Sequence, residues 1–96
     1  MSIRAWVLDK ARAAVMGERQ NNYGNPEDNF ARIAELWSAY LRNYGVTHKL
    51  QSHDVSLMLD LMKTARLQNM PGHADSWIDK AGYAACGAEV SGVEKE

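Results

Sequence analysis

The chain lacks several features that would place it in other classes of protein. Its single cysteine, Cys86, excludes an internal disulfide. No stretch approaches the roughly 18 apolar residues of a membrane span, and no secretory apolar core follows Met1. Neither sign of charge is in clear excess, because eleven Lys and Arg are matched by twelve Asp and Glu. We therefore expect a cytoplasmic protein that binds neither a membrane nor a nucleic-acid polymer.

Sequence patterns typical of metal, phosphate-loop or thiol chemistry are also missing. The three histidines show no spacing typical of a zinc site, and we expect them at the surface. The glycines between the predicted helices are isolated, so they do not form a glycine-rich phosphate loop. Cys86 falls among small residues, where a buried side chain is expected. These patterns do not support a zinc enzyme or a thiol enzyme.

Apolar residues at helical spacing are abundant. With 46% hydrophobic and 24% charged residues, the chain has the composition of an ordinary globular domain. The spacing predicts a single domain over residues 1–96, an all-α four-helix bundle with a frayed tail at 91–96. The helices are expected over about residues 2–17, 26–43, 53–68 and 75–90. Because these helices carry more apolar positions than one copy is expected to bury, we also expect a homo-oligomer.

The second of these helices has the clearest start signal. Asn25 is placed to cap the helix, Pro26 suits its first position, and acids occupy its first turn. One face is apolar and comprises Phe30, Ile33, Ala34, Trp37, Tyr40 and Leu41. We expect the helix to pack this face on the core. Ser52 is the expected cap of the next helix.

The third helix combines an apolar arc with charged residues. On a helical wheel of about 100° per residue, the arc comprises Val55, Met58, Leu59, Leu61, Met62 and Ala65. Asp54 and Arg66 fall inside this arc, and Lys63 lies at its edge. Asp60 lies outside the arc and is expected on a solvated face. The charged residues within the arc therefore need partners.

The last helix carries two carboxylates four residues apart, Asp75 and Asp79, on one stripe with Gly82. Two like charges beside a small residue are costly unless a cation, an arginine or water lies between them. Two interpretations are open. Either Arg66 forms a structural ion pair with one of these acids, or Arg66 and Lys63 bind the phosphate oxygens of a ligand.

Five runs of the chain form a recognisable set: Tyr23 to Phe30, Ile33 to Trp37, Asp54-Val55, Lys63 to Arg66, and Asp75 to Glu89. Together they resemble a family of small, largely uncharacterised phage and prophage proteins. The last run is the most specific, since Trp, two acids, Gly and Tyr rarely coincide at those offsets. The resemblance implies a helical fold and, for a phage-encoded protein, the cytoplasm of the host cell. It implies no settled activity.

An all-α bundle with acids on facing helices is also similar, more distantly, to the MazG-like nucleoside triphosphate pyrophosphohydrolases. In that family, carboxylates on two helices hold Mg²⁺, which bridges the phosphates and helps to activate a water. The resemblance implies Mg²⁺ ligands at Asp75 and Asp79, with Asp54 as a further ligand. The chain departs from the family because it lacks the glutamate cluster on the preceding helix and spaces its acids by four residues rather than three.

The leading hypothesis is that the chain binds a nucleotide or a similar phosphorylated small molecule, with Mg²⁺-dependent pyrophosphohydrolysis as the associated reaction. Asp54, Asp75 and Asp79 would hold the cation. Lys63 and Arg66 would meet the phosphates. The alternative is a non-catalytic phage accessory protein that sequesters a nucleotide or binds a host protein, with the acids and Arg66 forming a structural ion network.

The polar loop before Asn25 adds a candidate ligand contact. Tyr23 is a side chain on which a base could stack, with Arg19 and Asn29 beside it. Entry into the following helix explains most of the same residues. Self-association is also expected to complete a site between two copies.

Overall fold

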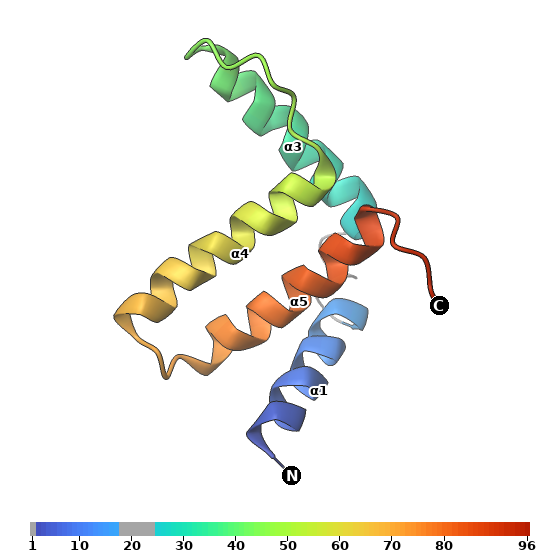
Figure 1. Cartoon of the computed structure of the whole chain (residues 1–96), viewed down its shortest axis with the longest axis vertical. Coiled ribbons are helices and arrows are strands. Elements are labelled where there is room, and N and C mark those ends of the chain that lie inside the picture. The colour runs from blue at the N-terminus through green and yellow to red at the C-terminus, as the bar shows by residue number, and fades with distance from the viewer. Residues whose placement is uncertain (1, 18–24) are drawn as a thin grey trace.

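Helices account for most of the described chain in the computed structural model, which describes residues 2–17 and 25–96 (Figure 1). The helices are α1 (Ile3–Met16), α3 (Pro26–Arg42), α4 (Ser52–Asn69) and α5 (Ala74–Val90). No strand occurs within these described ranges. The expected all-α fold is confirmed, and each predicted helix end lies within one residue of the observed end. None of the described helices has the length and hydropathy needed to cross a membrane.

Side-chain caps mark where α1, α3 and α4 begin. The Asp28 backbone N–H donates to Asn25 Oδ1 at 2.9 Å, so the predicted cap of α3 is confirmed. The cap expected at Ser52 is wrong, because that residue is the first of α4. There the Asp54 carboxylate accepts a hydrogen bond of 2.8 Å from the Gln51 backbone N–H. Asp54 therefore stabilises the start of its own helix.

Figure 1 shows α4 and α5 as an antiparallel pair with α1 alongside α5. α3 crosses this pair where α4 begins and α5 ends, and its C-terminal half extends away from the pair. The crossing holds a core of three buried side chains, Phe30, Ala34 and Val55. Tyr40 was expected on the packed face of α3, but it is exposed because it lies on the half that extends away.

Two glycines of α5 mark close approaches between helices. A Cβ atom at Gly82 would lie 3.2 Å from Val15 Cγ1 of α1. A Cβ atom at Gly87 would lie 2.5 Å from Ser56 Oγ of α4. The small residue beside the two acids of α5 therefore has a structural explanation, since Gly82 makes room for α1.

Substituting Gly87 by Ala is expected to lower the free energy of unfolding by about 1–2 kcal/mol, because the added methyl overpacks the α4–α5 contact and outweighs the gain in helix propensity. Thermal or urea unfolding measures the effect. Adding Ser56→Gly removes the clashing side chain and should recover part of the loss. Gly72→Ala is the matched control, because nothing lies within 4 Å of a Cβ atom there. An equal loss in both single variants would contradict the packing argument.

The core is small for the length of the chain. The buried apolar side chains are Ala11, Phe30, Ala34, Val55 and Leu67. The radius of gyration is 14.6 Å, whereas a compact domain of this length has about 12.5 Å. Large apolar side chains on every described helix stay exposed to solvent. The isolated chain is therefore more open than a self-sufficient domain of its size.

Candidate ligand-binding site

An ion pair lies in the contact between α4 and α5. Lys63 Nζ is 3.0 Å from Asp79 Oδ2, and the two side chains are only 12% and 13% exposed. The Lys63 ammonium therefore compensates the negative charge of Asp79 within the same chain. Lys63 is thus held against α5 by an acid of the chain itself.

A second ion pair lies one turn away along the same contact. Lys80 Nζ is 3.0 Å from Asp60 Oδ2 and also donates a hydrogen bond to Thr64 Oγ1. Asp60 was expected on a solvated face, and this expectation is wrong because Lys80 of α5 reaches it. The contact between α4 and α5 thus combines two ion pairs with the buried apolar side chains of α4, Val55 and Leu67.

The three acids assigned to a cation do not come together within one copy. Asp54 lies in the first turn of α4 and Asp75 in the first turn of α5. Because the helices are antiparallel and α4 is about 27 Å long, these first turns lie at opposite ends of the pair (Figure 1). Within the described residues, no group of three acidic, histidine or cysteine side chains is placed to hold a metal ion.

Arg66 is not the partner of either acid on α5. It was expected to pair with Asp75 or Asp79, but Lys63 occupies that position on Asp79. The reason is geometric, because residues three apart on a helix point about 60° away from each other. Arg66 is exposed and makes no ion pair with any residue that the structure describes.

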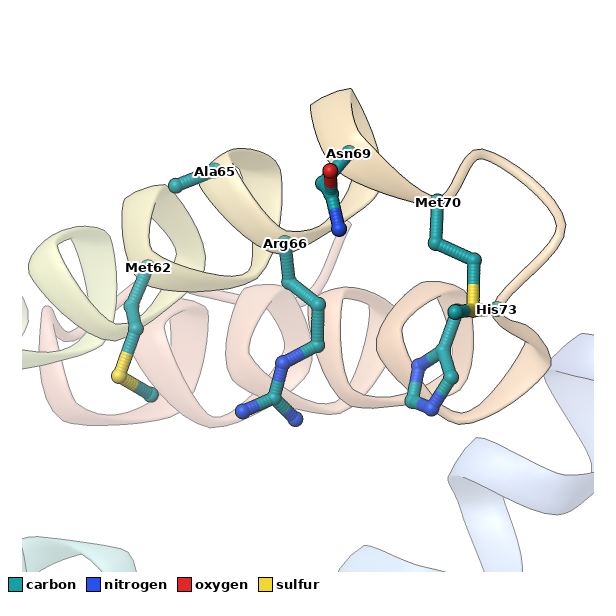
Figure 2. Close-up of a pocket in the computed structure, with 6 residues that line it drawn as sticks. All are labelled: Met62, Ala65, Arg66, Asn69, Met70 and His73. Carbon is teal, nitrogen blue, oxygen red and sulfur yellow. The ribbon is translucent and has the colours of Figure 1, made fainter.

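Arg66 instead lines a shallow hollow of about 600 Å³ at the C-terminal end of α4. Figure 2 shows the Arg66 and His73 side chains extending in the same direction, across α5. The lining residues are Met62, Ala65, Arg66, Asn69, Met70 and His73. Guanidinium, amide and imidazole groups can donate hydrogen bonds to an anion, while the methionines offer an apolar wall. The hollow can therefore accept a ligand with an anionic end and a flat apolar end.

His73 and Asn69 are the polar residues of the hollow that the sequence analysis did not assign to a site. His73 Nδ1 shares a hydrogen bond of 2.7 Å with Ser76 Oγ, and Ser76 is fully buried. This bond orients the imidazole and leaves Nε2 for a ligand. Asn69 follows Arg66 by three residues, so it lies on the same side of α4. A helical wheel places Asn69 near Arg66, but no sequence motif marks Asn69 as a site residue.

The candidate ligand loop is only partly described. Arg19 and Tyr23 lie outside the described residues. Asn29 is half-buried near the start of α3 and does not line the hollow. The structure therefore leaves the loop hypothesis as a prediction.

A perturbed tyrosine lies away from the hollow, near the end of α3. The side-chain hydrogen bond between Tyr40 and Tyr44, with oxygens 3.3 Å apart, raises the pKa of Tyr40 above its usual value. Neither ring lines the hollow. This shift gives no support for a catalytic role of Tyr40.

These features define a small all-α domain with an exposed hollow that carries donor side chains. Residues 6–91 match the family described as a domain of unknown function (DUF6378), and the chain belongs to that family. The prediction of a family of small phage proteins is confirmed by its relatives.

Two mycobacteriophage proteins are similar to the chain. The Gene 55 protein of Mycobacterium phage D29 is 41% identical over 80 residues, which cover 83% of this chain and 50% of that protein. The Gene 55 protein of Mycobacterium phage L5 is 38% identical over 78 residues, covering 81% of this chain and 47% of that protein. The chain thus spans about half the length of these relatives. No solved structure matches it.

Proposed function

We propose that this chain binds a phosphorylated small molecule, with nucleotides as the first candidates, in the hollow at the C-terminal end of α4. One observation carries the proposal: the Arg66 guanidinium is exposed beside Asn69 and His73, and it has no ion-pair partner among the described residues. A guanidinium suits phosphate because its planar donors match two oxygens at once.

The apolar wall of the hollow favours a nucleotide over inorganic phosphate. Met62 and Met70 line it on either side of Arg66 in the sequence. Methionine side chains make favourable contacts with flat aromatic rings. A ligand that places its phosphates on Arg66 and its base on the methionines would use both kinds of lining residue.

Mg²⁺ would bind to the protein together with the phosphorylated ligand. Protein sites commonly bind Mg²⁺ through one or two carboxylates plus the phosphates of a substrate. Asp75 is exposed and lies two residues after His73, so it is the acid best placed for that role. Asp79 is held by Lys63 and Asp54 caps α4. Mg²⁺-dependent pyrophosphohydrolysis, suggested by the MazG-like resemblance, would depend on Asp75 and on phosphates held by Arg66.

Replacing Arg66 by Ala is expected to weaken nucleotide binding by about 10- to 100-fold, which corresponds to the loss of charged hydrogen bonds to phosphate. Isothermal titration calorimetry with a panel of nucleoside mono-, di- and triphosphates, with and without Mg²⁺, measures it. Arg32→Ala is the matched control, because Arg32 is also an exposed arginine but lies on α3. Equal binding by wild type and Arg66→Ala would reject the hollow as the site.

Sequestration without turnover is the second candidate function. It is favoured by the engagement of Asp79 with Lys63 and of Asp54 with a backbone N–H, which leaves few acids for a catalytic metal. The same panel separates the candidates. Product release that requires Mg²⁺ supports the enzyme, whereas binding without product supports sequestration.

A further inference from the structure

Helix α4 buries only part of its apolar surface. Val55 and Leu67 are buried, and the side toward α5 also carries ion-paired and hydrogen-bonded groups, namely Ser56, Asp60, Lys63 and Thr64. Large exposed apolar residues lie elsewhere on the helix, and we call them the outer face of α4: Leu57, Met58, Leu61 and Met62. Their spacing of one, three and one residues makes a continuous stripe. No described residue of the chain covers this stripe.

We propose that a second copy of this chain covers the outer face, with the two α4 helices antiparallel about a twofold axis near Leu61. In such an isologous contact each copy presents the same surface. Apolar residues that repeat every three or four positions interlock across an antiparallel helix pair. The proposal does not depend on any ligand, so it stands apart from the proposed function.

The apolar area of this face supplies much of what an interface needs. Leu57 and Leu61 are 60% and 64% exposed, and both methionines are at least 40% exposed. The stripe presents on the order of 400 Å² of surface, within the range of the largest apolar patch of a typical monomer. Two copies would bury on the order of 800 Å² from these four side chains alone, and the residues of α4 that flank the stripe would add the remainder of the roughly 1,000 Å² of a specific interface.

The position of Asp54 favours the antiparallel arrangement. Asp54 lies in the first turn of α4, on the same side of the helix as the stripe and about seven residues before the proposed axis. A parallel pair would place the two Asp54 carboxylates together, whereas an antiparallel pair separates them along the helices.

The interface adjoins the hollow without being the same surface. Met62 belongs to the outer face and also lines the hollow with Arg66. A second copy seated on the outer face would therefore bring the start of its own α4 to the rim of the hollow.

Substituting Leu61 by Lys is expected to convert the oligomer into a smaller species, because two ammonium groups would meet at the axis. Leu36→Lys is the matched control, since Leu36 on α3 is equally exposed at 64%. Light scattering coupled to size exclusion gives the mass, and circular dichroism verifies the helical fold. Wild type should have the mass of two or more copies, and only Leu61→Lys should lower it. A monomeric wild type, an unchanged Leu61→Lys mass, or a loss of mass in Leu36→Lys would overturn the proposal.

Oxidative cross-linking tests the arrangement without relying on a disruptive charge. In a Cys86→Ala background, Leu61→Cys should form a disulfide-linked dimer, because Cα atoms near the axis can lie within about 7 Å. Leu57→Cys should not, since the two copies of that residue would be about 12 Å apart along the antiparallel helices. Equal cross-linking at both positions would indicate a parallel pair and overturn the antiparallel arrangement.

Discussion

Asp79→Asn is expected to lower the free energy of unfolding by about 3–5 kcal/mol in metal-free buffer, because the change leaves the Lys63 ammonium without its counter-charge. Both side chains are nearly buried, so water cannot replace the lost partner well. Asn keeps the volume of Asp and can still accept a hydrogen bond, so the effect reports the charge. Urea unfolding followed by circular dichroism measures it.

A paired replacement is the control for this prediction. Lys63→Met combined with Asp79→Leu removes both charges and should recover most of the stability, because apolar side chains of similar size can replace a buried pair. Lys80→Met breaks the more exposed pair with Asp60 and should cost less. If Asp79→Asn left stability unchanged and abolished Mg²⁺ or nucleotide binding, Asp79 would act as a ligand rather than as a structural partner.

Phe30→Ala is expected to cost about 3–5 kcal/mol, because it removes the largest buried side chain at the crossing of α3 with the α4–α5 pair. A domain of this size has about 5–15 kcal/mol of total stability, so partial unfolding at ordinary temperature is the expected outcome. Chemical unfolding and the near-ultraviolet circular dichroism of the tryptophans measure it. Leu36→Ala on the same helix is the control, since Leu36 is exposed. Similar losses in the two variants would contradict the assignment of the core.

The helices could be predicted because their signals are local. Asn25 and Pro26 set the start of α3, and Pro71 with Gly72 separates α4 from α5. Such signals act within a few residues, so they do not depend on how the rest of the chain packs. The all-α class follows from the same periodicity.

The orientation of α4 could not be predicted, because its apolar arc is broader than one contact surface. The wheel places Val55 and Leu61 in one arc, yet Val55 is fully buried while Leu61 is exposed. The side of α4 that turns inward carries Lys63, which pairs with Asp79 of α5, as well as the buried Val55. Ion pairs between distant segments of the chain cannot be recognised from the spacing of residues within one helix.

The candidate site was predicted in part. Arg66 was identified from its position inside the apolar arc, and it lines the hollow. Lys63 was expected to bind the same ligand as Arg66. The two side chains point about 60° apart around α4, so Lys63 contacts Asp79 and does not line the hollow. His73 reaches the hollow through the turn between α4 and α5, whose path is set by tertiary structure.

The most direct test of the account is an NMR titration of the chain with nucleoside triphosphates, in which the backbone amide shifts are followed residue by residue. Binding in the hollow predicts that the largest shifts fall at residues 62–73 and that Arg66→Ala removes them while Arg32→Ala does not. Largest shifts on α3 or α1, or no shift with any nucleotide in the presence or absence of Mg²⁺, would contradict it.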